Sequence, residues 1–139
     1  MLLPDHATFE VSTKAAIYNE TATKVLVMEY GGGRMYGLPG GHLDLGETPF
    51  QAMKRELIEE LGVDQDFDLV PQDFFVHEGN TKRPRLILGY VGSANEATAF
   101  VFDSHDYDER GIWMDREMFA ATPISDGYRA FINKHWPTT

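Results

Sequence analysis

The chain has 139 residues and no cysteine, and its 22 acidic and 12 basic residues give a formal net charge of -10. This length is typical of one domain with its own core, so we expect residues 1–139 to form a single domain. The lack of cysteine excludes a disulfide scaffold, a thiolate nucleophile, an iron-sulfur cluster and cysteine-ligated zinc. The negative charge disfavours nucleic-acid polymers as partners, whereas a small phosphate compound can still bind together with cations.

The N-terminal residues Met-Leu-Leu-Pro-Asp-His lack the basic start and the apolar segment of a secretory signal peptide. No apolar run in the sequence approaches the length that crosses a membrane. We therefore expect a cytoplasmic protein without a membrane partner.

Two strands are predicted near the start of the chain. Apolar runs at residues 15–18 and 24–28 are separated by a polar stretch at 19–23, which is typical of two strands and a turn. Gly31, Gly32 and Gly33 then end the strand pattern. A phosphate-binding loop would need a following Gly-Lys-Ser or Gly-Lys-Thr, which is absent, so we interpret these glycines as a turn between strands.

Residues 48–62 predict a helix with clear start and stop signals. Thr48 can cap the helix, Pro49 suits its first position, and Gln51 completes a capping box. Gly62 supplies the stop. Apolar side chains recur at spacings of three and four and predict a core-facing stripe of Phe50, Met53, Leu57 and Leu61.

The same helix carries three carboxylates on another face. Glu56, Glu59 and Glu60 stand at i, i+3 and i+4, within a fan of roughly 100°. They repel one another, and Arg55 can offset part of the repulsion through Glu59, four residues later. Taken alone, the cluster has two interpretations: a solvated acidic face, or a site for a hard cation such as magnesium, which prefers oxygen ligands.

The second half of the chain predicts further strands at residues 73–77, 85–91 and 112–114, and a last helix over 125–136. Strands before, between and after two helices, without regular alternation, indicate a mixed sheet covered by helices. The predicted fold class is therefore α/β.

The residues before and within the first helix resemble the full signature of the Nudix hydrolases. Gly41 is followed after five residues by Glu47, and after seven more by the run Arg55–Val63, Arg-Glu-Leu-Ile-Glu-Glu-Leu-Gly-Val. A chance match to these spaced positions has a probability on the order of 10⁻⁷. The Leu-Pro-Gly-Gly sequence ending at Gly41 and the segment 112–115 extend the resemblance, whereas Tyr36 stands where members often carry tryptophan.

This resemblance implies an α/β/α sandwich around a mixed sheet and an enzyme that needs a divalent cation, Mg²⁺ or alternatively Mn²⁺. It implies hydrolysis of a diphosphate bond in a small nucleoside diphosphate linked to another group, with release of a nucleoside monophosphate. Candidate substrates are nucleoside triphosphates, nucleotide sugars and dinucleotides. The expected assembly is a monomer or a homodimer.

The resemblance also implies roles for individual residues. Glu56 and Glu60 resemble the principal metal ligands, and Glu59 resembles either a further ligand or the base that activates water. The backbone carbonyl of Gly40 would bind a metal ion, and Arg55 would orient the glutamates. Metal-assisted catalysis fits this set because cations neutralise the phosphate oxygens and lower the pKa of an attacking water.

Further candidate site residues lie outside the acidic cluster of the helix. Glu47 would be an auxiliary ligand, and Glu109 lies where some relatives place an additional carboxylate. Arg83 and Arg85, next to Lys82, form a local basic cluster that would contact substrate phosphates or lie in a solvated loop. Side chains that either stack on a base or pack in the core are Tyr36, Phe75, Tyr90 and Tyr107. None of the five histidines has metal-ligand spacing.

Two other functions compete with a small-molecule hydrolase. One is a nucleotide-sensing module with the same fold but no turnover, which would have no need to keep Arg55, Glu56, Glu59 and Glu60 together. The other is removal of diphosphate from RNA 5' ends, which the net negative charge disfavours. The complete signature favours the enzyme.

Overall fold

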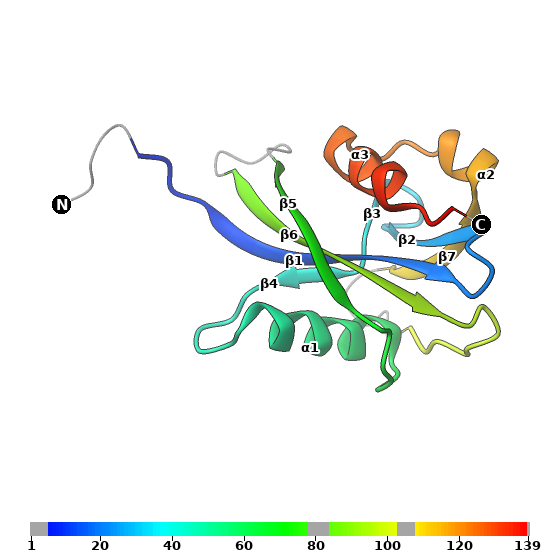
Figure 1. Cartoon of the computed structure of the whole chain (residues 1–139), viewed down its shortest axis with the longest axis horizontal. Coiled ribbons are helices and arrows are strands. Elements are labelled where there is room, and N and C mark those ends of the chain that lie inside the picture. Colours follow the sequence, from blue (N-terminus) through cyan, green and yellow to red (C-terminus); the bar gives the residue numbers. More distant parts are fainter. Residues whose placement is uncertain (1–5, 78–83, 103–107, 139) are drawn as a thin grey trace.

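The computed structural model describes residues 6–77, 84–102 and 108–138. The elements in this part of the chain, labelled in Figure 1, are β1 (Glu10–Asn19), β2 (Lys24–Tyr30), β3 (Met35–Gly37), β4 (Gly40–His42), α1 (Pro49–Leu61), β5 (Val70–His77), β6 (Arg85–Ala94), β7 (Arg110–Asp115), α2 (Arg116–Ala120) and α3 (Asp126–His135). None of these helices combines the length and the apolar character needed to cross a bilayer.

The described strands form one mixed sheet with a branch. Its main path runs β3-β2-β1-β6-β5, while β4 pairs with β1 and β7 pairs with β2. β1 is parallel to β6 and antiparallel to its other partners. The first half of β1 pairs with β4 at Ser12, Thr13 and Lys14, whereas Tyr18, near its end, pairs with β2. This branch places β4, rather than β2, next to α1.

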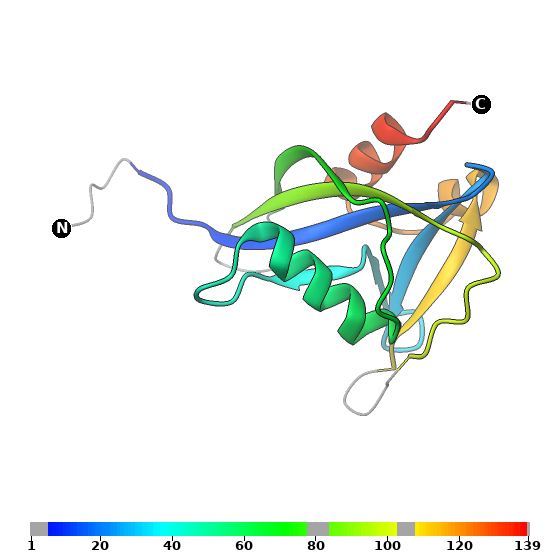
Figure 2. The same ribbon diagram turned by 60° about the horizontal axis from the view of Figure 1, so that its bottom comes forward.

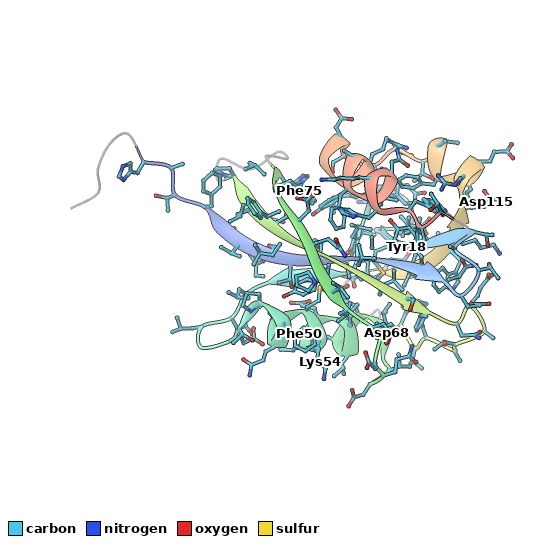
Figure 3. The ribbon with its side chains drawn as sticks, in the orientation of Figure 1. Tyr18, Phe50, Lys54, Asp68, Phe75 and Asp115 are labelled. Carbon is cyan, nitrogen blue, oxygen red and sulfur yellow. The ribbon has the colours of Figure 1, made fainter. Side chains whose placement is uncertain are left out.

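Helices cover both faces of the sheet. Figures 1 and 2 show α1 on one side and α2 and α3 on the other. Alternate residues of β1 point to opposite faces, so Ile17 lies in the core under α1, and Tyr18 lies in the core under α3 (Figure 3). Tyr18 also donates a hydrogen bond from its hydroxyl to the carbonyl of Ile132. The layers confirm the predicted α/β/α sandwich.

The start and stop signals of α1 act as predicted. The hydroxyl of Thr48 accepts a hydrogen bond from the backbone of Gln51, and the side-chain oxygen of Gln51 accepts one from the backbone of Thr48. Gly62 ends the helix at φ 69° and donates its N–H to the carbonyl of Ile58. A left-handed residue at this position favours glycine.

One member of the predicted apolar stripe is wrong. Phe50 is 47% exposed, whereas the buried side chains of the helix are Ala52, Met53, Leu57 and Leu61. Phe50 lies in the first turn at the margin of the core, with its ring centroid 6.3 Å from that of Tyr90, and helps to line a surface pocket together with Lys54 (Figure 3). A first-turn position has no preceding helical turn to cover its ring.

The sequence underestimates some elements and misses others. The strand predicted at 73–77 begins at Val70, and the strand predicted at 85–91 continues to Ala94. The three-residue strands β3 and β4 were not predicted, nor was α2, a short helix capped by the side chain of Asp115. These short elements depend on long-range pairing or on a local cap, so periodicity does not reveal them.

The packing of α1 against the core predicts how two variants of the helix affect stability. Leu57 is 1% exposed, whereas its neighbour Ile58 is 42% exposed. We expect Leu57→Ala to lower the free energy of unfolding by about 2–4 kcal/mol, because it leaves a cavity. Ile58→Ala is the matched control and should cost less than about 1 kcal/mol. Urea denaturation checks this, and equal losses from both variants would contradict the packing described for α1.

Candidate active site

Arg55 is the centre of a hydrogen-bonded network between α1 and the segment before it. Its Nε donates to Glu47 at 2.7 Å, and its Nη1 donates to Glu56 at 3.1 Å and to Glu59 at 3.2 Å. Its Nη2 donates to Glu47 at 3.0 Å and to the carbonyl of His42 at 3.0 Å. The planar guanidinium thereby fixes three carboxylates and one backbone group at once.

Glu47 anchors the segment between β4 and α1. Besides Arg55, its carboxylate accepts a hydrogen bond from the backbone of Asp44 at 2.8 Å. The hydrogen bonds from Arg55 and then from Asp44 hold the pKa of Glu47 below its usual range. Glu47 is therefore a charged support for Arg55, the position that the sequence assigned to an auxiliary role.

Glu56 and Glu60 lie against β4 at two successive glycines, Gly41 and Gly40. A Cβ at Gly41 would lie 2.5 Å from a carboxylate oxygen of Glu56. The backbone N–H of Gly40 donates to Glu60 at 2.9 Å. Glu59 differs from both, because its side chain is 57% exposed and contacts Arg55. The three predicted carboxylates thus occupy distinct environments.

Gly40 has a backbone conformation that other residues rarely adopt. Its φ is 135°, and a Cβ there would lie 2.0 Å from the carbonyl oxygen of Thr13. This close approach follows from the pairing of β4 with β1, in which Gly40 is opposite Lys14. Any larger residue at Gly40 would push β4 away from β1 and move the peptide that contacts Glu60.

Lys14 is a functional candidate that the sequence analysis missed. Its Nζ donates to the carbonyl of Gly40 at 3.0 Å and to the carbonyl of Leu38 at 3.2 Å. Burial lowers the pKa of Lys14, and the nearby charges of Glu60 and Glu56 partly offset this. The available signal was a lone lysine directly before the apolar run at 15–18, on a strand with both faces covered.

Burial also acts on the carboxylates beside Lys14. It raises the pKa of Glu60 to about 8, although Lys14 and the Gly40 N–H favour the ionised form. Burial likewise raises the pKa of Glu56, against the charge of Arg55, and the pKa of Glu109, against the charge of Lys14. Desolvation therefore outweighs the neighbouring positive charges at all three carboxylates, which is a common feature of functional sites.

The donor chemistry of this region fits a hard divalent cation. The nearby donors are carboxylate oxygens and a backbone carbonyl, with no thiolate in the chain. Within the described ranges, however, no three Asp, Glu, His or Cys side chains stand close enough to form a ready-made metal site. Arg55 draws Glu59 outward and the Gly40 N–H holds Glu60, so these side chains would need to turn to share one cation.

Arg85 lies on the α3 face of the sheet, the face that Lys14 also occupies. It is opposite His77 in the pairing of β5 with β6, and its buried Nε has no hydrogen-bond partner among the described residues. The charge of Arg85 lowers the pKa values of both Lys14 and His77, after the larger effect of burial. A buried guanidinium nitrogen without a partner is an unsatisfied donor, which makes Arg85 a candidate for contact with an anion.

The other residues predicted to contact the substrate lie in different surroundings. The hydroxyl of Tyr36 donates to Glu29 at 3.2 Å, and its ring packs against the core under α3. Phe75 packs against Tyr128 and Phe131, and Tyr90 is 5% exposed, so the structure favours core packing for both. The predicted candidates that lie outside the described residues are Lys82, Arg83 and Tyr107.

The chain matches a known protein family over most of its length. The family described as NUDIX domain matches residues 8–134, whereas no curated protein matches the chain. The dihydroneopterin triphosphate pyrophosphohydrolase of E. coli has a TM-score of 0.75 at 20% identity, with 93% of this chain and 97% of that chain covered.

Two further solved structures are similar over most of their length. The NUDIX domain of Shewanella oneidensis NrtR, in complex with ADP ribose, has a TM-score of 0.75 at 15% identity and covers 96% of this chain and 90% of its own. An Ap4A hydrolase of C. elegans has a TM-score of 0.73 at 18% identity and covers 90% of this chain and 93% of its own. At these identities the likeness shows a shared fold.

The raised pKa of Glu60 predicts how stability depends on pH. Between pH 5 and 8 the folded protein retains the proton on Glu60 to a greater extent than the unfolded chain, whose glutamate pKa is near 4.5. The metal-free protein should therefore lose stability as pH rises, by up to about 1.4 kcal/mol per pH unit from this group.

We expect Glu60→Gln to reduce this slope, because an amide does not titrate. Urea denaturation in the presence of a chelator, repeated from pH 5 to pH 8, measures it. Glu117→Gln, which changes an exposed residue of α2, controls for the loss of one negative charge. An unchanged slope in Glu60→Gln would mean that Glu60 is not desolvated in the folded protein.

Proposed function

Because this chain belongs to the NUDIX domain family and is a Nudix hydrolase, we propose that it cleaves a diphosphate bond in a small nucleotide with the help of Mg²⁺. The substrate would be a nucleoside diphosphate linked to another group, and one product would be a nucleoside monophosphate. The observation that carries the proposal is the placement of the half-buried Glu56 and Glu60 against β4, beside the Arg55 network.

A bound Mg²⁺, or alternatively Mn²⁺, would be held by Glu56, Glu60 and the carbonyl of Gly40, with Glu59 within reach on the same helix. It would neutralise phosphate oxygens and lower the pKa of the attacking water. The support for this assignment is the set of oxygen donors and the burial that raises the pKa values of Glu56 and Glu60, because a bound cation would offset that desolvation.

Glu59 is the proposed base that accepts a proton from the attacking water. Its carboxylate is 57% exposed, so water can reach it, whereas Glu60 is engaged by the Gly40 N–H. Arg55 would hold Glu59 and Glu56 at a set separation, since one Nη1 donates to both. Glu109, whose charge interacts with that of Lys14, would add negative charge as an auxiliary carboxylate.

Arg85 would bind the substrate's phosphates. Its Nε lacks a partner among the described residues, and a phosphate oxygen is a strong acceptor for a guanidinium donor. Arg83 is proposed for the same role from the segment before β6. Tyr36 is proposed to contact the substrate through the edge of its ring, while its hydroxyl remains bonded to Glu29.

Three similar structures carry names that suggest a range of substrates. They are a dihydroneopterin triphosphate pyrophosphohydrolase, an Ap4A hydrolase and a NUDIX domain bound to ADP ribose. All three compounds contain phosphates joined by anhydride bonds, which supports a small phosphoanhydride as substrate. The net charge of -10 favours such a compound over an RNA 5' end, because a polyanion would be repelled.

Glutamate variants test the proposed function. A panel of nucleoside triphosphates, nucleotide sugars and dinucleotides with Mg²⁺ should yield a nucleoside monophosphate from at least one member. We expect Glu59→Gln and Glu60→Gln to lower kcat by about 100-fold or more, because one loses the base and the other a cation ligand. Product formation is followed by chromatography.

Glu117→Gln on α2 is the matched control for this experiment and should retain the activity of the unmodified protein. Full activity in Glu59→Gln and Glu60→Gln would exclude the proposed roles. Binding of a nucleotide with no product from any member of the panel would favour the sensing module over the enzyme.

Arg85 makes a separate kinetic prediction. Arg85→Met should raise KM by about tenfold with a smaller effect on kcat, because a phosphate contact is present in the bound substrate as well as in the transition state. Arg116→Met, which removes an arginine on α2, controls for the loss of one positive charge. A fall in kcat with an unchanged KM would assign Arg85 to the chemical step rather than to binding.

A further inference from the structure

The ammonium group of Lys14 donates a hydrogen bond to the carbonyl of Gly40, which the proposed function assigns to a cation. Its Nζ lies 3.0 Å from the carbonyl oxygen of Gly40 and 3.2 Å from that of Leu38. Lys14 and Gly40 are direct partners in the pairing of β1 with β4. The side chain therefore reaches both carbonyls from the strand that supports them.

Gly40 is held on both sides. Its N–H donates to Glu60 at 2.9 Å, and its carbonyl accepts from Lys14. Lys14 thus connects β1 through Gly40 to the carboxylate of α1. The charge of Lys14 also acts on Glu60 and Glu56 directly, since each favours the charged ammonium group. Lys14 thus supplies positive charge to the same groups that would bind a metal ion.

A divalent cation and an ammonium group compete for such a site. A cation bound to the Gly40 carbonyl oxygen would strongly repel an ammonium nitrogen that remained at hydrogen-bonding distance from the same oxygen. The carbonyl of Leu38 gives Lys14 a second acceptor, which can retain the side chain when its bond to Gly40 is broken.

We propose that Lys14 is a positioning residue that holds the Gly40 carbonyl in the metal-free enzyme and limits the affinity for a divalent cation, because its ammonium group must leave that carbonyl before a cation is bound there. This inference rests on the proposed function, which places a cation at Gly40. Lys14 keeps the site assembled at low cation concentration, and it weakens cation binding as a consequence.

The test is direct titration of the chelator-treated protein with Mn²⁺, observed by electron paramagnetic resonance without any substrate. Lys14→Met removes the charge but keeps an unbranched side chain of similar length. We expect it to bind Mn²⁺ about tenfold more tightly than the unmodified protein, the factor that corresponds to the loss of one competing hydrogen bond from a charged group. Lys14→Arg retains a cationic donor and should bind Mn²⁺ within a few-fold of the unmodified protein.

A high-salt titration separates competition at the carbonyl from a general effect of charge. Raising the ionic strength from about 0.1 M to about 1 M shortens the screening length from about 10 Å to about 3 Å. The tighter binding of Lys14→Met should persist at high salt, because contact at Gly40 is too short to be screened. Arg85→Met, which removes a nearby cation that does not contact Gly40, should change the affinity less.

The possible failures have different meanings. If the unmodified protein binds Mn²⁺ and Lys14→Met binds it equally or more weakly, the inference is overturned while the proposed function stands. If the unmodified protein binds no Mn²⁺, both are overturned. Lys14→Gln retains one N–H donor without the charge and repeats the test if Lys14→Met does not fold, as judged by circular dichroism.

Discussion

Strand β4 can lie between β1 and helix α1 only because two successive residues of that strand lack side chains. Gly40 passes so close to β1 that a Cβ would overlap the carbonyl of Thr13, and Gly41 faces the carboxylate of Glu56 at a distance that no Cβ could share. This steric constraint decides the remainder of the site. It sets the depth at which Glu56 and Glu60 are buried, and it brings the N–H of Gly40 to Glu60.

The closeness that the glycines allow creates an electrostatic problem, which the chain solves with two cations of different character. Arg55 stands at the solvent side and holds carboxylates through several short hydrogen bonds in a fixed geometry. Lys14 stands on the sheet side and contacts backbone carbonyls rather than the carboxylates themselves. A delocalised guanidinium suits a permanent brace, whereas a compact ammonium group on a flexible stem can move.

The sequence predicts α1 well, because capping and periodicity are local properties, whereas the roles of its carboxylates stay a prediction. The capping box at Thr48 and the stop at Gly62 are confirmed. Lys14 could not be found in this way, since its role arises when β1 pairs with β4, and nothing adjacent in sequence marks that pairing.

The same limit explains the error at Phe50. The spacing of apolar residues gives the direction of its side chain around the helix, but not where along the helix the core ends. The distinct environments of Glu59 and Glu60 were also beyond the sequence, because they depend on the distance between α1 and β4 and not on the helix itself.

The parallel pairing of β1 with β6 has a consequence for how the site forms. Glu10 at the start of β1 pairs with Arg85, so two segments separated by β2, β3, β4, α1 and β5 must meet before the central sheet exists. Such long-range contacts carry a large loop-closure entropy and are typical of slow folding steps. α1 can form early from local signals, yet Lys14 and Arg85 share a face only after this late pairing. A nascent chain would therefore form the acidic helix α1 before the sheet that brings Lys14 next to its carboxylates.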